Sequence, residues 1–238
     1  MKFSPLIFIV LCGMSYYSYA AAPVLVGYIE RPPAIYQTAD GRLRGSMGKR
    51  LVKLFSDARI NVDYEQFKPS EIDDFMVNEM VDAFLATPIL FDKSGDFVYT
   101  KKPFIQLSFY AYRLPSQTPV SSVPELSGST IILPISPRGV RGNTKGTFLD
   151  PELNINVLRQ NYTLTQALPL LRNGSADYYV SYIAPNEHAF NFSSVFQRSK
   201  LQADELFSVP MHIVMRESNP KSDEVIATLN KLLEKNIN

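Results

Sequence analysis

Hydrophobic positions along the first third of the chain fall into short apolar runs separated by stretches with helical spacing. The runs at 24–29, 61–67 and 83–86 predict three strands. Two amphipathic helices are predicted between them, the first after a turn at Asp40 and the second capped by Ser70. The alternation of strand and helix predicts a parallel sheet with right-handed crossovers.

A second series with the same order follows further along the chain. Its strands are predicted at 130–133, 155–158 and 178–182, with a loop or short helix at 138–148 and a helix at 165–172. Two series of this kind predict an α/β protein with two similar lobes. The cleft between two lobes is a preferred place for a ligand.

Two stretches, 78–86 and 173–181, share one layout: a helix ends at an Asn, a short turn follows, and an Asp introduces an apolar run. At such a turn the carboxylates of Asp82 and Asp177 can accept hydrogen bonds from backbone N–H groups, so we expect both to be structural. The stretches are either one repeated unit or two unrelated units with ordinary turn chemistry.

Two longer apolar runs connect the series. The run at 105–113 leads out of the first lobe, and the Pro-rich segment 114–124 is typical of a linker or a slow turn. The run at 206–215 leads back to a final helix capped by Ser222. If that helix packs on the first lobe, the two runs are crossing strands that form a hinge. The expected lobes are 21–110 with 208–238, and 111–207.

The first residues have the pattern of a secretory signal peptide. Lys2 precedes an apolar run at 6–14, and Ser18 and Ala20 are small residues at a cleavage site, so residues 1–20 are predicted to be removed. The run is too short to span a membrane. We expect export to the periplasm and no membrane insertion after cleavage. Cys12 lies in this segment, so no disulfide holds the mature chain together.

The charges of the chain balance, with 24 Lys and Arg against 23 Asp and Glu. No bulk field therefore attracts nucleic acid or an anionic membrane. The mature chain has no cysteine and only His188 and His212 as histidines, and it lacks a Gly-rich phosphate loop. We expect no metal, no cofactor and no catalytic residues.

Several short motifs occur in a characteristic order and spacing: Pro32-Pro33, Asp40-Gly-Arg-Leu-Arg-Gly45, Val81-Asp82-Ala83, Pro103-Phe104, Leu126-Ser-Gly128 and Asn173-Gly-Ser-Ala-Asp177. With them nearly the whole mature chain resembles the bacterial solute-binding proteins of family 3, the polar amino-acid type. The resemblance implies the type II periplasmic-binding fold. It also implies a monomeric Venus-flytrap protein that closes on a small solute for the membrane subunits of an ABC importer.

The ligand-binding positions depart from this family. Its carboxylate-binding Arg lies twelve residues after the position of Asp82, where this chain has Ser94. Its ammonium-binding Asp lies five residues after the position of Asp177, where this chain has Tyr182. An aromatic residue of the family is replaced by Ala34.

These departures argue against a standard α-amino acid as ligand. Removing one partner of a buried charge pair costs about 2–5 kcal/mol, whereas a micromolar affinity amounts to only about 8 kcal/mol. An α-amino acid is expected to bind only if another arginine takes its carboxylate, namely Arg31, Arg138 or Arg141.

Aromatic and arginine side chains near the expected cleft suit an aromatic or anionic organic solute instead. The candidate ligand-binding residues are Tyr28, Arg31, Tyr36, Thr87, Phe91, Ser94, Arg138 and Tyr182. Arg31 and Thr87 are the strongest, because they follow the first and third strands, and open α/β sheets bind ligands at strand ends.

Two other functions remain open. The same fold can present a ligand to a sensor protein or signalling receptor, as an adaptor rather than a transport protein. Relatives of the fold also include dehydratases of small carboxylic acids, for which Glu30 or Glu187 would be the general acid.

Overall fold

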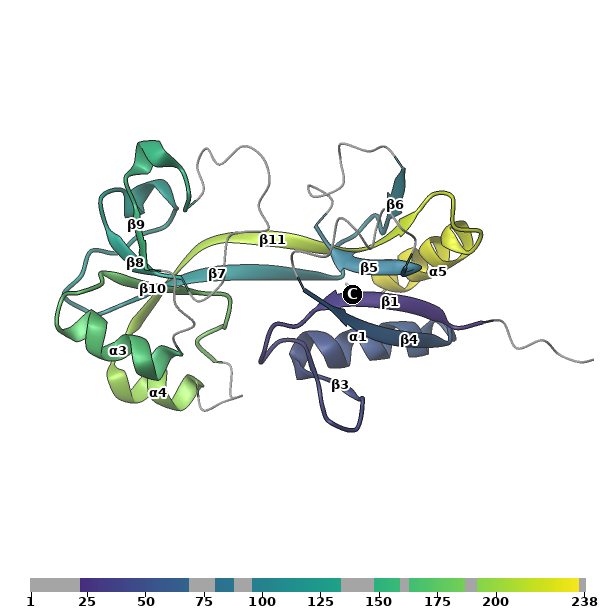
Figure 1. Ribbon diagram of the computed structural model, residues 1–238, viewed down its shortest axis with the longest axis horizontal. Coiled ribbons are helices and arrows are strands. Elements are labelled where there is room, and N and C mark those ends of the chain that lie inside the picture. Colours follow the sequence, from purple (N-terminus) through teal and green to yellow (C-terminus); the bar gives the residue numbers. More distant parts are fainter. Residues whose placement is uncertain are drawn as a thin grey trace, which may run out of the picture.

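The chain folds into two lobes joined by two long strands (Figure 1). The computed structural model describes residues 22–68, 80–87, 96–133, 148–158, 163–186 and 192–235. The expected signal peptide, the helix predicted after Ser70, most of the segment 138–148, and the candidates Phe91, Ser94 and Arg138 lie outside these residues.

Lobe 1 is built around β1 (Val24–Ile29), which lies between β4 (Val62–Phe67) and β5 (Ala83–Ala86). Both neighbours run parallel to β1, as the strand–helix–strand order predicts. The next strand, β11 (Gln202–Arg216), is antiparallel to β5, and β6 (Phe97–Tyr99) pairs with β11.

Lobe 2 repeats this arrangement. Its central strand β8 (Thr130–Ile132) lies between β9 (Asn156–Leu158) and β10 (Tyr178–Ser181), and both neighbours are again parallel to it. The next strand, β7 (Ile105–Arg113), is antiparallel to β10. The fold is therefore the predicted two-lobed α/β architecture; the exact lobe boundaries stay predictions.

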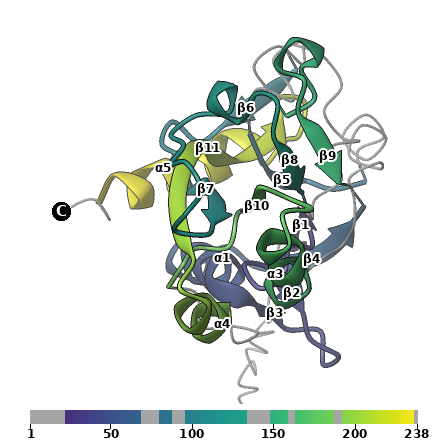
Figure 2. The same ribbon diagram turned by 90° about the vertical axis from the view of Figure 1, so that its left-hand side faces the viewer.

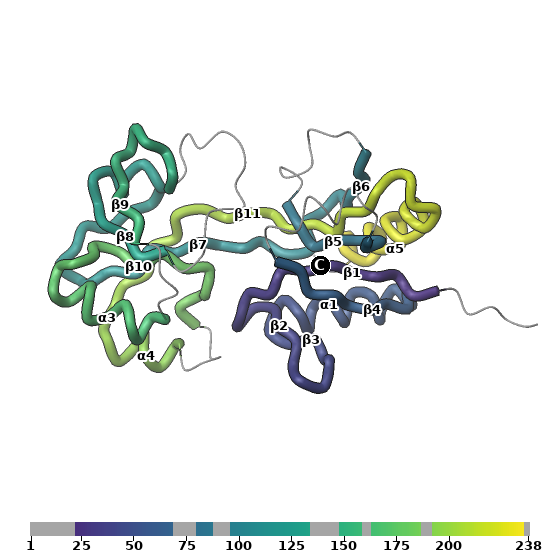
Figure 3. The backbone as a smooth tube through the Cα atoms, viewed as in Figure 1, coloured from purple at the N-terminus to yellow at the C-terminus, as the bar shows by residue number. Residues whose placement is uncertain are grey.

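Both β7 and β11 run through the two lobes, and the tube in Figure 3 shows the chain crossing twice between them. The two strands pair from Gln202 opposite Arg113 to Met211 opposite Ile105, with a bulge between Glu205 and Phe207. Figure 2, viewed from the end of lobe 2, shows them side by side. β11 begins earlier than the predicted 206.

Two helices cover one face of each lobe's sheet. In lobe 1, α1 (Gly45–Asp57) and α5 (Ser222–Lys235) enclose a core that includes the fully buried Leu51. Burying such a side chain contributes about 1.5–3 kcal/mol. In lobe 2, α3 (Leu164–Arg172) packs with α4 (Phe192–Ser199), a helix that we did not predict.

The ends of the helices follow local chemistry. Thr163 and Gln166 form a capping box at the start of α3. Arg59, just after α1, has a φ of 56°, the left-handed conformation in which helices commonly end. Ser222 is the first residue of α5 and its hydroxyl donates to the Glu217 carbonyl at 3.4 Å, so it is not the cap before the helix that we predicted. The short elements are β2 (Tyr36–Gln37), β3 (Leu43–Arg44), η2 (Pro124–Leu126) and η4 (Pro151–Leu153).

The paired aspartates make the same contacts in both lobes. The Leu25 N–H donates to the Asp82 carboxylate at 2.9 Å, and the Asp82 N–H donates back to the Leu25 carbonyl at 2.9 Å. Likewise, the Thr130 N–H donates to the Asp177 carboxylate at 2.8 Å, and the Asp177 N–H returns to the Thr130 carbonyl at 2.7 Å. Each aspartate therefore joins the strand it introduces to the central strand of its lobe.

We predict that Asp177→Ala lowers the free energy of unfolding by about 1–3 kcal/mol, because the half-buried Thr130 N–H loses its partner. Urea unfolding followed by circular dichroism measures the change. Asp63→Ala removes an exposed carboxylate from β4 and should change stability by less than about 0.5 kcal/mol. Equal effects of the two substitutions would contradict the structural role.

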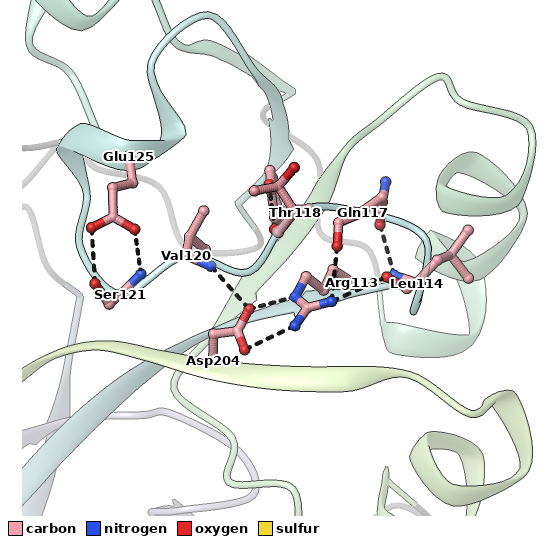
Figure 4. Close-up of polar contacts among 9 residues, drawn as sticks. Arg113, Leu114, Gln117, Thr118, Val120, Ser121, Glu125 and Asp204 are labelled. Carbon is pink, nitrogen blue, oxygen red and sulfur yellow. Dashed lines mark hydrogen bonds and ion pairs between the residues drawn. The ribbon is translucent and has the colours of Figure 1, made fainter.

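A second polar anchor fixes the segment between β7 and η2, which was predicted to be a linker or a turn (Figure 4). The Arg113 guanidinium lies 2.5 Å from the Asp204 carboxylate, and the two side chains are only 5% and 19% exposed. Arg113 also donates to the Gln117 carbonyl at 2.9 Å, and Asp204 accepts from the Val120 N–H at 3.2 Å. The segment is therefore a fixed turn on lobe 2 rather than a free linker.

Removing one partner of this pair leaves the other charge largely buried. Arg113→Met should lower the free energy of unfolding by about 3–5 kcal/mol. Adding Asp204→Leu to it should restore part of the loss, since the uncompensated carboxylate is then gone. A double variant less stable than Arg113→Met, measured by urea unfolding, would show that the anchoring bonds of Asp204 outweigh the charge effect.

Candidate functional site

The turn after β1 carries Arg31 and is pressed against the start of α1. The Arg31 N–H donates to the Ile35 carbonyl at 2.8 Å, and the Ala34 carbonyl accepts from the Met47 N–H at 2.8 Å. At Gly45, a Cβ would lie 2.3 Å from the Ala34 carbonyl oxygen, and its φ is +87°, so only glycine fits. The backbone that positions Arg31 is thus held firmly.

Tyr182 brings the two lobes into direct contact. It follows β10 in lobe 2, and its hydroxyl donates to the Pro32 carbonyl of lobe 1 at 2.7 Å. Its ring lies edge-on against Phe109 of β7, with centroids 6.4 Å apart and an interplanar angle of 69°. Tyr182 therefore touches lobe 1, lobe 2 and a crossing strand.

Burial raises the pKa of Tyr182 to about 12; the Arg31 guanidinium opposes this shift, and the Glu30 carboxylate adds to it. Burial lowers the pKa of Arg31, and Tyr182 acts in the opposite direction. Glu30 is turned to β4, where it accepts a hydrogen bond from the Gln66 amide at 3.1 Å. Among the residues that the structure describes, no carboxylate forms an ion pair with Arg31.

Tyr28 and Thr87 lie near the same edge of the lobe 1 sheet. β1 and β5 are parallel neighbours, with Val26 level with Ala83, so Arg31 and Thr87 both follow strand ends at that edge. The Tyr28 and Thr87 hydroxyls are buried and have no hydrogen-bond partner within the described part of the chain. Burial raises the pKa of Tyr28, and Glu30 raises it further.

A cavity of about 150 Å³ opens between the lobes beside Tyr182. Its walls come from the turn after β1, the start of α1, the part of β7 between the lobes, and the loop after β10. They comprise Pro33, Ala34, Ser46, Met47, Ile105, Gln106, Leu107, Ser108, Tyr110, Tyr182, Ile183 and Ala184.

The structure brings only some of the predicted site residues together. Arg31 and Tyr182 lie close enough to affect each other's pKa, and Thr87 lies at the same sheet edge as Arg31. Tyr36 is in β2, paired with Arg44 of β3, and does not line the cavity. The roles of all these residues in binding stay predictions.

Sequence reasoning missed the contribution of β7. Gln106, Ser108 and Tyr110 alternate with apolar residues and all line the cavity. Period-2 alternation of polar residues within the apolar run 105–113 was the available signal. The contact of Tyr182 with Pro32 spans 150 positions, and no local pattern indicates it.

The described residues contain no group of three or more His, Cys, Asp or Glu side chains able to hold a metal ion. His212 is buried in β11, where its Nδ1 lies 2.6 Å from the Thr100 carbonyl oxygen, a structural role. No helix in the described ranges is long and apolar enough to cross a membrane.

No family model and no curated protein matches the sequence. Solved structures do match. The GluR0 ligand-binding core in complex with L-glutamate is 16% identical, with a TM-score of 0.61 over 92% of this chain and 95% of that one. The unliganded, open L-cystine solute receptor of Neisseria gonorrhoeae is 12% identical, with a TM-score of 0.59 over 90% and 86%. An arginine periplasmic binding protein from Legionella pneumophila is 15% identical, with a TM-score of 0.54 over 90% and 92%.

The chain has the two-lobed periplasmic-binding-protein fold. The fold implied by the family 3 resemblance is confirmed, and at these identities the likeness extends to the fold alone. In a two-lobed binding-protein fold, the contact of Tyr182 with Pro32 lies between the lobes, next to Arg31, which has no counter-charge within the described ranges.

We predict that Tyr182→Phe removes one tyrosine that ionises near pH 12. Because its pKa in the folded protein is raised above the usual value of about 10, its contribution to stability is complete below about pH 10 and is lost as the pH rises through about 12. The difference between the phenolate absorbance titrations of wild type and variant gives this pKa. Tyr99→Phe removes the hydroxyl of an exposed tyrosine for comparison. If the ionisation that Tyr182→Phe loses lies near pH 10 instead, the Tyr182 hydroxyl is exposed to solvent in solution and the prediction is wrong.

Proposed function

We propose that the chain is an exported solute-binding protein that holds a small organic anion between its lobes. The observation that carries this proposal is Arg31, a half-buried arginine at the contact between the lobes with no carboxylate partner in the described residues. A desolvated charge without a partner is costly to the folded protein. A bound anion would supply the missing charge through paired hydrogen bonds.

The surroundings of Arg31 favour an anion over a zwitterion. Tyr182, the nearest group from lobe 2, donates its hydroxyl proton to the Pro32 carbonyl and offers no negative charge to an ammonium group. The Glu30 carboxylate accepts a hydrogen bond from the Gln66 amide on β4. A carboxylate ligand would therefore find a cation here, whereas the ammonium group of an α-amino acid would find no dedicated acceptor.

The mechanism follows from the two crossing strands. A solute that contacts Arg31 in lobe 1 and Tyr182 in lobe 2 binds the closed arrangement better than the open one. It shifts the population toward closure by that difference in affinity. β7 and β11 connect the lobes and act as the hinge. The closed protein would deliver its solute to the membrane subunits of an ABC importer.

Thermal unfolding of residues 21–238 with a panel of carboxylates, amino acids and polyamines tests the proposal. An anion at 100 times its Kd should stabilise the wild type by about 2.7 kcal/mol. Arg31→Gln should abolish this stabilisation. Arg198→Gln removes an exposed arginine of α4 and should leave it unchanged.

Without solute, Arg31→Gln should unfold at the same temperature as the wild type or higher, because it removes an uncompensated charge. This separates a binding role from a structural one. Stabilisation by polyamines rather than anions, or by anions equally in both arginine variants, would refute the proposed role of Arg31. A lower unfolding temperature of ligand-free Arg31→Gln would mark it as structural.

A further inference from the structure

The bulge in β11 divides the paired strands β7 and β11 into two halves. Residues 202–205 pair with 110–113 in the half that belongs to lobe 2. Phe207 is the first paired residue of the other half, where it lies opposite Phe109, and this half continues toward lobe 1. A bulge interrupts the pairing and bends its strand. Contacts that join the two halves across the bulge therefore resist a change in the angle between the lobes.

On one face of the two strands, a row of aromatic rings crosses the bulge. Phe207 stacks on Phe109, with ring centroids 4.7 Å apart and an interplanar angle of 14°. The centroid of Phe207 also lies 5.8 Å from that of Phe148, and both of these rings pack on a core of lobe 2 that includes the buried Leu206. Phe109 packs on the core of lobe 1. The stacked pair therefore joins the cores of the two lobes.

On the opposite face, polar side chains cross the bulge. Ser108 and Ser208 pair with each other next to the two phenylalanines, and side chains alternate between the faces of a strand. The Ser208 hydroxyl lies 2.7 Å from the Ser108 hydroxyl and donates to the carboxylate of Glu205, on the lobe 2 side of the bulge, at 2.8 Å. Hydrogen bonds from both serines hold the pKa of the Glu205 carboxyl below its ordinary value, so the acceptor is the ionised carboxylate.

We propose that these contacts form a latch across the bulge that holds the two lobes at one angle. The backbone of Phe207 and Ser208 belongs to the half of β11 that leads to lobe 1. Their side chains instead contact Phe148 and Glu205 in lobe 2. Bending at the bulge moves the backbone of one half against the other, so it has to separate these contacts.

The latch also connects the crossing strands to the contact between the lobes. Phe109 touches Phe207 beside the bulge and Tyr182 after β10, and the Tyr182 hydroxyl donates to the Pro32 carbonyl. Separation of the rings at the bulge is thereby coupled to loss of the Tyr182 bond. Packed contacts of this kind switch between discrete arrangements, so the lobes change angle in one step. This goes beyond the proposed binding of a solute, because the latch acts without one.

Distances between spin labels on the two lobes test the latch. Residues 21–238 contain no cysteine, so labels attach only to introduced ones. Ser56→Cys in α1 and Ser194→Cys in α4 place one label at an exposed position of each lobe. Double electron–electron resonance of the solute-free protein then gives the distribution of the distance between the lobes. With the latch intact, we expect one dominant maximum.

Two variants break the latch on opposite faces of the strands. Ser208→Ala removes the hydrogen bond to Glu205, and it should raise the ratio of the second population to the first by about threefold, since this bond is exposed. Phe207→Leu removes the stacked ring but keeps an apolar side chain, and it should raise the same ratio by about fivefold. Either variant can carry the test if the other folds poorly.

Matched controls remove the same groups within a single lobe. Ser127→Ala removes an exposed hydroxyl that donates to the Leu153 carbonyl at 2.8 Å in lobe 2. Phe97→Leu removes a half-buried ring of lobe 1 that lies 5.6 Å from the Arg216 guanidinium. Neither control should change the distance distribution.

A larger second population in Ser208→Ala or Phe207→Leu, and in neither control, would support the latch. A distribution that stays unchanged in both latch variants, or that changes equally in the controls, would overturn it. A wild-type distribution as broad as that of the variants would also overturn it, because nothing would then hold the angle. None of these outcomes depends on Arg31, so the proposed function stands or fails separately.

Discussion

The sheets of both lobes depend on the same hydrogen-bonding arrangement of an aspartate with the central strand, which occurs once in each lobe. In each lobe an aspartate just before the third strand exchanges hydrogen bonds with a residue of the central strand, Leu25 in one lobe and Thr130 in the other. This exchange fixes the register of β5 against β1 and of β10 against β8. It therefore also sets where those strands end, and the residues of the site follow those ends. In lobe 1 the Asn219 amide, which precedes α5, also donates to Asp82 at 2.7 Å.

The site combines two kinds of chemistry around one side chain. Tyr182 lies near Arg31, a cation with no counter-charge among the described residues, and it also lines the cavity against β7. The hydroxyl of Tyr182 joins the lobes through its hydrogen bond to the Pro32 carbonyl. The contacts of a solute that bridges the lobes would add to this bond.

The sequence was sufficient for most elements of the fold because their cores are local and periodic. Residues such as Met47, Leu51 and Phe55 show the buried face of α1 directly. The helix α4 was missed because it is short, and its Phe192 is placed by contact with Tyr112, far away in sequence.

The site was less accessible to sequence reasoning. The position of Arg31 follows from the end of β1, but only the folded chain shows that none of the described carboxylates pairs with it. The hydrogen bond between Tyr182 and Pro32 forms only where the two lobes come together, so no local sequence pattern indicates it. The early start of β11 was missed for a related reason: Gln202 is polar and exposed, and it becomes part of a strand only through pairing with Arg113.

The bulge in β11 determines where the two crossing strands can bend. Strands that serve two sheets at once resist bending, because a change of angle between the lobes strains every ladder bond along them. Between Glu205 and Phe207 the register shifts, so the ladder is already interrupted there, and bulges concentrate twist. Rotation of lobe 2 can therefore be absorbed at this one point, on the lobe 2 side of the crossing. The pairs on the lobe 1 side of the bulge, from Phe207 to Met211, would then turn together with lobe 1, and those from Gln202 to Glu205 with lobe 2.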